Sequence, residues 1–473
     1  MFQGGFVSNM KKSQIFCKLS AAPALIETAA TLTLQGQVAG GTGLSVEVAG
    51  LARHVAIGDR VRLRPRSGGA VPAEIVGFRG GLARAMAYGP LDGLGPGSPA
   101  TVELAGPGSL AALGGTLPVS DAWLGRVVDP IGRPLDGHGP LPPGPSRPVR
   151  ADPPDAALRA RLGPRIDLGV RALDAFATCR RGQRIGLFAG SGVGKSTLLS
   201  MLARGTGCDV AVLALVGERG REVREFLEDD LGVDGLARSV VVIATSDSPP
   251  LMRREAAYAA MTIAEHFRDQ GKSVLLLMDS VTRFCLALRE IGLSAGEPPA
   301  TRGYPPSVFA ELPRLLERAG PGPEPAPGRP GGAGHITALF TVLVEGDDHN
   351  EPVADAVRGI LDGHVILDRR IGEAGRYPAV DVLRSLSRTV PGCLSKEEAA
   401  LVRRARAVLA LQAEMADLVR LGAYRAGSDP AVDEAIRLAP RIEAVLRQDR
   451  DERTDLDDSF ALLRAAMEIS DAA

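Results

Sequence analysis

The spacing of apolar and polar residues changes along the 473-residue chain. In the first part, short stretches alternate between apolar and polar positions and are separated by glycine-rich turns, as at 45–48, 60–63 and 74–76. Alternation over so few residues is typical of short antiparallel strands with one buried face. We therefore predict a small β-barrel over 25–104, preceded by an N-terminal extension over 1–24.

After residue 184, apolar runs of five to eight residues alternate with helical stretches; the runs are 211–216, 240–244, 274–278 and 337–344. Runs that are apolar on both faces and separated by helices indicate a parallel sheet buried between helical layers. We predict an α/β core over 105–390. A proline- and glycine-rich stretch at 321–334 interrupts it, and we expect this stretch to be an exposed loop.

Helical patterning takes over near the C-terminus and predicts a helical domain over 391–473. Ser395 and Glu398 have the spacing of a capping box ahead of the first apolar helix positions. Asp429, which a proline follows, predicts the start of a second helix, and Asp458 predicts the start of a third.

The amino-acid composition argues against several kinds of function. Lys and Arg number 55 against 56 Asp and Glu, so the net charge of −1 supplies no overall attraction to nucleic acid or to an anionic membrane. The five cysteines show no C-x-x-C spacing and the six histidines no metal-ligand spacing, which favours reduced thiols over a disulfide frame or a zinc site. No 18-residue apolar stretch and no signal-peptide core occur, so we expect neither a membrane-spanning segment nor secretion by that route.

The strongest chemical signal is the sequence Ala-Gly-Ser-Gly-Val-Gly-Lys-Ser-Thr at 189–197, which follows an apolar run and precedes a helical stretch. Such a loop wraps phosphate oxygens with backbone N–H groups, its lysine reaches the β- and γ-phosphates, and its hydroxyl can ligate Mg²⁺. A plain glycine-rich turn needs neither a lysine nor a hydroxyl at this spacing. We therefore predict nucleoside triphosphate binding by Gly190, Ser191, Gly192, Val193, Gly194, Lys195, Ser196 and Thr197.

Two carboxylates follow apolar runs of the predicted sheet. Asp279 comes after the run 274–278, where a carboxylate can bind Mg²⁺ through water; alone, it could equally be a turn or cap residue. Glu218 comes shortly after the run 211–216, at the same predicted edge of the sheet. A carboxylate there can orient and deprotonate a water that attacks the γ-phosphate, although Glu218 could also be a solvated member of the charged run 218–224.

Several segments resemble known proteins. The segments 187–196, 217–222 and 279–284 look like the catalytic core of the F-type and V-type rotary ATPase superfamily, and 378–387 matches its ten-residue signature throughout. Within that superfamily, three further segments are similar to the type III secretion and flagellum-specific export ATPases: 296–310, 346–352 and 422–430.

The resemblance implies a RecA-like P-loop core and a role for individual residues. It implies that Glu218 is the catalytic base, that Arg219 supports it, and that Lys195 and Ser196 hold phosphate and Mg²⁺ together with the carboxylate of Asp279. Tyr377 matches the aromatic residue that stacks on adenine; by itself it could be an ordinary core tyrosine. Arg388 matches an arginine finger donated across a subunit interface; by itself it could be a surface salt-bridge arginine.

The implied function is a homohexameric, Mg²⁺-dependent ATPase that energises flagellar type III protein export. Implied partners are a stator or regulator protein, a central stalk-like protein, the export gate, and export substrates with their chaperones. The implied location is the cytoplasm, at the inner-membrane export apparatus. The host-directed injectisome ATPase is the near alternative. Two other classes of protein are an RNA-translocating hexamer and a non-catalytic nucleotide-binding subunit. The low aromatic content of the barrel argues against the RNA-translocating hexamer. Glu218 argues against the non-catalytic subunit.

Overall fold

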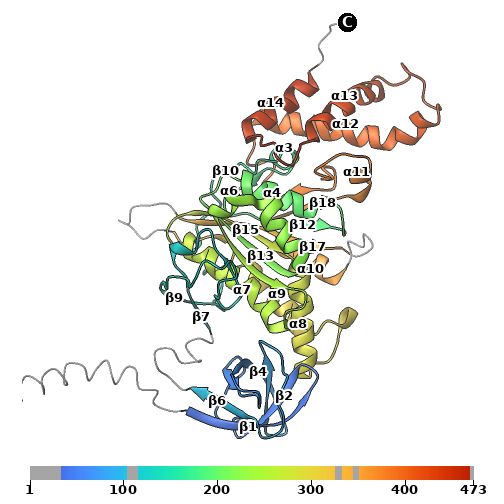
Figure 1. The fold of residues 1–473 in the computed structure, drawn as a ribbon. Coiled ribbons are helices and arrows are strands. Elements are labelled where there is room, and N and C mark those ends of the chain that lie inside the picture. The colour runs from blue at the N-terminus through green and yellow to red at the C-terminus, as the bar shows by residue number, and fades with distance from the viewer. Residues whose placement is uncertain (1–32, 104–114, 325–332, 345–350, 469–473) are drawn as a thin grey trace, which may run out of the picture. The chain divides into compact units, whose positions relative to one another are not determined.

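The computed structural model describes residues 33–103, 115–324, 333–344 and 351–468. Contacts divide the chain into two compact units (Figure 1). The first unit ends at Thr116 and also includes Leu293–Glu297, and the second contains Leu117–Gly292 and the chain from Pro298 onward. The predicted extension 1–24 lies outside the described residues, as do 325–332 of the proline- and glycine-rich stretch.

The first unit contains the β-barrel that the alternating pattern predicts. Six antiparallel strands close on themselves in the order β1-β2-β5-β4-β3-β6. Alternate strand residues such as Val46, Val48 and Ile75 fill the interior and are almost fully buried. The strands are β1 (Thr33–Thr42), β2 (Ser45–Ala49), β3 (Arg60–Leu63), β4 (Val71–Arg79), β5 (Leu82–Ala87) and β6 (Pro99–Glu103).

The second unit is built on a largely parallel sheet, so the predicted fold class is confirmed. Among the described residues nine strands join it, in the order β19-β18-β12-β17-β15-β13-β14-β8, with β16 beside β17. Only β19 and β16 run antiparallel to their neighbours in this part of the chain. The strands are β8 (Val127–Val128), β12 (Arg184–Ala189), β13 (Val210–Glu218), β14 (Ser239–Thr245), β15 (Ser273–Asp279), β16 (Gly320–Pro321), β17 (His335–Leu343), β18 (Gly363–Leu367) and β19 (Leu386–Ser387).

Helices cover both faces of this sheet, which explains why its strands are apolar throughout. Leu213 of β13 packs with α3 (Arg171–Phe176) and α4 (Lys195–Gly205), whereas the preceding Val212 faces the opposite layer. That layer contains α7 (Pro250–Arg268), α8 (Val281–Ala295), α9 (Pro306–Leu316) and α10 (Pro352–Ile360). The short remaining elements are β7 (Thr116–Pro118), η1 (Asp121–Trp123), β9 (Ser146–Pro148), β10 (Arg165–Ile166), β11 (Cys179–Arg180), α5 (Gly220–Glu225), η2 (Phe226–Leu231), α6 (Gly232–Ala237), η3 (Thr301–Gly303) and α11 (Arg369–Glu373).

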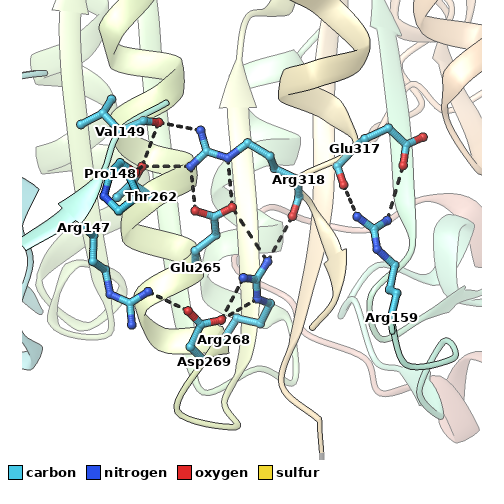
Figure 2. A network of polar contacts seen from close by, with 10 residues as sticks. All are labelled: Arg147, Pro148, Val149, Arg159, Thr262, Glu265, Arg268, Asp269, Glu317 and Arg318. Atoms are coloured by element: carbon cyan, nitrogen blue, oxygen red, sulfur yellow. Dashed lines mark hydrogen bonds and ion pairs between the residues drawn. The ribbon is translucent and has the colours of Figure 1, made fainter. Parts of the chain in front are cut away.

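A buried polar network holds α7 to the segment after α9 (Figure 2). Arg318 has no exposed side-chain surface and pairs with Glu265, with 2.7 Å between Nη2 and Oε2. Its guanidinium also donates to the carbonyl of Val149 at 2.6 Å and to the hydroxyl of Thr262 at 3.0 Å. Burial of this charge is tolerated because its donors find acceptors.

The C-terminal helices are α12 (Lys396–Arg420), α13 (Pro430–Leu446) and α14 (Leu456–Met467), which lie side by side and pack against the α3 side of the core (Figure 1). The Ser395–Glu398 capping box and the Asp429 cap are confirmed. The third predicted start was wrong: Asp455 caps α14 by accepting from the N–H of Asp458, which lies inside the helix. No helix in the described part of the chain is long and apolar enough to cross a bilayer.

Candidate functional site

The phosphate-binding sequence forms the turn between β12 and α4. β12 ends at Ala189, α4 begins at Lys195, and the turn between them contains Gly192 and Gly194 with φ of +76° and +87°. Other residues rarely adopt these left-handed conformations, which let backbone N–H groups point into the turn. Strand, loop and helix therefore follow in the order that phosphate binding requires.

Two predicted carboxylates meet the loop lysine at the carboxyl edge of the sheet. Lys195 Nζ contacts Asp279 Oδ1 and lies 3.3 Å from Glu218 Oε1. Asp279 ends β15, and Glu218 ends the neighbouring β13. The pairing of β13 with β14 shifts register between Val216 and Glu218, a bulge of the kind that redirects a side chain next to a functional site.

The charges of this trio influence one another because all three side chains are largely buried, with exposed fractions of 12% for Lys195, 14% for Glu218 and 5% for Asp279. Burial lowers the pKa of Lys195, but attraction to Asp279 and Glu218 outweighs it, so the pKa is raised and the lysine stays charged. Burial and repulsion from Asp279 together raise the pKa of Glu218 above its ordinary value, against the opposing effect of Lys195. A carboxylate with a raised pKa is a better proton acceptor at neutral pH.

Lys195 and Glu218 line a cavity of about 920 Å³, and Asp279 lies behind Lys195, in contact with its Nζ. The phosphate loop forms one wall, and Glu218 and Arg219 lie on another. The guanidinium of Arg219 pairs with Glu222 at 3.2 Å and not with Glu218. Ser191, Ser196 and Thr197 line the cavity, whereas Val193 is buried behind the loop.

Four further residues belong to this site but were not predicted as site residues; two of them, Thr282 and Arg283, lie within the segment 279–284. Thr341 of β17 donates its hydroxyl to Asp279 Oδ1 at 2.7 Å, and Thr282 accepts from the N–H of Leu343 at 2.9 Å. Arg283 and Arg369 line the cavity, and Arg369 donates to the carbonyl of Ser191 at 3.0 Å. Thr341 could have been found as a hydroxyl inside an apolar run, and Thr282 and Arg283 as members of the segment 279–284, whereas Arg369 lies in none of the segments singled out in the sequence.

Tyr377 lies against the phosphate loop, outside the cavity wall. A Cβ built on Gly194 would be 3.4 Å from two carbon atoms of the Tyr377 ring, and 48% of the tyrosine is exposed. A ring that is close to the loop but open to solvent has a free face for stacking.

Arg388 is not brought into this site. It follows β19, which pairs with the start of β18, and its N–H donates to the carbonyl of Asp362 at 2.9 Å. The N–H of Asp362 in turn donates to Arg184, the first residue of β12. Arg388 therefore lies at the amino edge of the sheet, about 17 Å from the phosphate-loop edge at roughly 3.3 Å per strand residue.

This fold and site define a P-loop protein of the nucleotide-binding class, with two carboxylates positioned beside the loop lysine. Comparison with known proteins agrees. Residues 169–387 match the nucleotide-binding domain of the ATP synthase alpha/beta family, and residues 394–465 match the T3SS EscN ATPase C-terminal domain.

Proteins that are similar over most of the chain indicate which family within this class it belongs to. The chain is 55% identical over 443 residues to the flagellum-specific ATP synthase of Caulobacter vibrioides, covering 93% of this chain and 97% of that protein. It is 48% identical to the type 3 secretion system ATPase of Xanthomonas euvesicatoria, covering 90% and 93%. Among solved structures, the assembled ATPase EscN in complex with its central stalk EscO, from enteropathogenic E. coli, superposes with a TM-score of 0.79 at 38% identity and covers 92% and 100%. The chain belongs to the family of flagellum-specific and type III secretion ATPases.

Proposed function

We propose that this protein is a homohexameric ATPase that hydrolyses ATP to ADP and phosphate and thereby energises flagellar type III protein export. Its work in export would be the release of substrates from chaperones and their unfolding at the export gate. The observation that carries the proposal is the convergence of Glu218 and Asp279 on the Nζ of Lys195 beside one cavity, in a chain with 55% identity to a flagellum-specific relative.

The residues at the site fit a Mg²⁺–ATP complex. Ser196 supplies a hydroxyl at the cavity, Asp279 supplies a carboxylate beside Lys195, and oxygen ligands of this kind suit Mg²⁺. When bound, Mg²⁺ neutralises charge that develops on the phosphate oxygens. We assign Ser196 and Asp279 to this ion, and Arg283, Arg369 and the loop N–H groups to the phosphates. ATP binding requires Lys195 to turn from Asp279 toward the β- and γ-phosphates.

Glu218 acts as the general base in this proposal. Its carboxylate orients the attacking water and accepts a proton from it, which its raised pKa favours. Arg219 lies beside it on the cavity wall and keeps a positive charge near the γ-phosphate. Tyr377 stacks on the adenine base from its place beside Gly194.

Arg388 completes the site of a neighbouring subunit. Its position at the amino edge of the sheet prevents it from reaching its own phosphate loop, so a catalytic role requires a second chain. An arginine finger contributes about 10³- to 10⁵-fold in rate. An isolated subunit would therefore be nearly inactive, and the assembled ring would be the active form.

The proposed partners follow from this function: a stator or regulator protein, a central stalk-like protein, the export gate, and substrates with their chaperones. The proposed location is the cytoplasm, at the cytoplasmic face of the inner-membrane export apparatus. The solved relative EscN is described in complex with its central stalk, which supports a stalk partner here. The injectisome ATPase remains the near alternative, and the higher identity to the flagellum-specific relative favours the flagellar assignment.

A nucleic-acid translocase is a poorer fit. Phe78 and Tyr88 are the aromatic residues within 25–104, and Tyr88 is buried with its hydroxyl donated to Glu74 at 2.6 Å. Base stacking needs exposed rings along a basic groove.

The test is the specific ATPase activity of the purified protein over a range of protein concentrations, with and without RNA. Activity per milligram should rise with concentration as rings assemble, and RNA should leave it unchanged. Activity that is independent of concentration would contradict interfacial catalysis, and strong stimulation by RNA would favour the translocase.

A further inference from the structure

Hydrogen bonds fix the backbone around Tyr377 at four carbonyl groups, one of which, that of Ala379, accepts from the N–H of Asp368 in the core at 2.9 Å. The N–H of Gln448 donates to the carbonyl of Tyr377 at 2.9 Å. The guanidinium of Arg376 donates to the carbonyl of Val380 at 2.9 Å and to that of Pro378 at 3.4 Å. The direction in which the Tyr377 ring leaves the backbone therefore depends on Arg376 and Gln448.

Arg376 depends on the helical domain. It is 6% exposed, and its Nε lies 2.7 Å from the Oε2 of Glu443, a residue of α13. Burial lowers the pKa of Arg376, and attraction to Glu443 and Asp381 opposes this. A buried guanidinium needs such a partner to keep its position, so Glu443 helps to fix the group that holds the Tyr377 segment.

Gln448 forms a second link from the same domain. Its side chain is buried and donates to the carbonyls of Gly169 at 2.9 Å and Glu452 at 3.0 Å, and it accepts from the N–H of Arg171 at 2.9 Å. These bonds lock the chain after α13 onto the core. Thus Glu443, through Arg376, and Gln448, directly, both hold the backbone segment that contains Tyr377.

We propose that Arg376 and Glu443 are positioning residues through which the C-terminal helical domain sets the orientation of Tyr377 and the affinity of the site for the adenine base. The inference rests on the proposed function, in which Tyr377 stacks on adenine. The Tyr377 ring lies next to Gly194, close enough that a Cβ at this glycine would be 3.4 Å from it, so a small shift of the 376–380 segment moves the ring relative to the phosphate loop. The phosphate contacts come from other segments and are unaffected.

Glu443→Ala tests the link, and Glu434→Ala is its matched control. Both glutamates lie on α13 and pair with an arginine, but the partner of Glu434 is Arg404 within the helical domain. Because 47% of the Glu443 side chain is exposed and Arg376 keeps two carbonyl acceptors, we expect the Glu443→Ala protein to fold, and its melting temperature checks this. Two probes are measured, Mg²⁺–ATP and inorganic tripolyphosphate, which offers phosphates but no base.

We expect Glu443→Ala to weaken ATP binding about two- to fivefold and to raise the KM for ATP equally, with kcat within about twofold of the parent protein. Tripolyphosphate binding should not change, and Glu434→Ala should match the parent in every measurement. In a Tyr377→Ala background, Glu443→Ala should have no further effect on ATP binding, because its influence passes through the ring.

The results of these measurements distinguish the positioning role of Glu443 from the adenine contact of Tyr377. If Tyr377→Ala weakens ATP relative to tripolyphosphate but Glu443→Ala does not, the positioning role is wrong and the adenine contact stands. If Glu443→Ala weakens both probes equally, the ion pair acts on the whole site and the inference fails. If Tyr377→Ala leaves ATP binding unchanged, the proposed adenine contact itself is overturned, and the inference with it.

Discussion

At the scale of single residues, the site divides between contacts with the ground state and contacts that matter during reaction. Lys195 contacts both carboxylates in this structure, and in the proposed mechanism it turns to the phosphates when nucleotide binds. Glu218 has no phosphate to bind; its raised pKa suits it to take a proton from water. Substitutions at the two positions should therefore fail at different steps.

We expect Glu218→Gln to retain Mg²⁺–ATP binding and to lower kcat by about 10²- to 10⁴-fold, the usual contribution of a general base. Glu225→Gln is the matched control, since Glu225 lies on the adjacent α5, is exposed and pairs only with Arg221 among the described residues. Binding of a fluorescent ATP analogue and steady-state turnover are the two measurements. Turnover within tenfold of the parent by the Glu218→Gln protein would remove this residue from the base role.

The sequence predicted the phosphate loop and the two carboxylates that follow apolar runs, but it missed Thr282 and Arg283 within the segment 279–284 and Thr341 and Arg369 from other parts of the core. Glu218 and Asp279 were predictable because each ends an apolar run whose neighbours in the sheet could be inferred. Thr341 reaches Asp279 only through the register of β17 against β15, and no pattern in one strand contains that register. The sequence also does not show whether Arg219 pairs with Glu218 or with Glu222, because both carboxylates are nearby along the chain; the structure pairs it with Glu222.

At the scale of elements, the hydrophobic pattern predicted the barrel, the parallel strands and the helical domain. It did not predict which polar residue begins a helix or which charged residues are buried. Asp455 and Asp458 both precede apolar helix positions, and the cap is made by Asp455, three residues earlier than predicted. The buried Arg318–Glu265 pair had no sequence signal, because charged residues at the end of an amphipathic helix usually face solvent.

Removing the Arg318–Glu265 pair should weaken the contact between α7 and the segment after α9 and so destabilise the fold. We expect Arg318→Met to lower the free energy of unfolding by about 3–5 kcal/mol, since it leaves the carboxylate of Glu265 buried with a weakened set of partners. Arg314→Met, which removes an exposed pair with Glu311, should cost no more than about 1 kcal/mol. Thermal and denaturant unfolding measure both; equal losses would mean that the buried network contributes nothing special.

The proline- and glycine-rich stretch should be dispensable for the chemical step. Gly322 donates to the carbonyl of Gly334 at 2.9 Å, so the residues that flank 325–332 are already joined. Replacing 325–332 by a linker of about four residues should leave kcat and KM within about twofold. A loss of activity without a change in melting temperature would show that the stretch takes part in catalysis.

At the scale of the whole molecule, the placement of Arg388 makes a mixing experiment decisive. Lys195→Ala and Arg388→Ala proteins should each be nearly inactive, and an equal mixture should recover activity. In a randomly mixed closed ring about a quarter of the interfaces pair an intact Lys195 with an intact Arg388, which sets the upper limit if sites fire independently. Mixtures that co-assemble and stay inactive would show that Arg388 does not act across the interface; since it lies at the opposite edge of the sheet from its own phosphate loop, its role would then be structural.

The segment 378–387 has a consequence beyond either site. It begins next to Tyr377, beside one phosphate loop, and ends next to Arg388 at the opposite edge of the same sheet. In the proposed ring, ten residues thus span the distance between one nucleotide and the next. A displacement of Tyr377 at one site would therefore be coupled through this span to Arg388 at the next interface, and by linkage a displacement of Arg388 would act back on Tyr377. Each chain of the ring would thus join two nucleotide sites through a single stretch of its sequence.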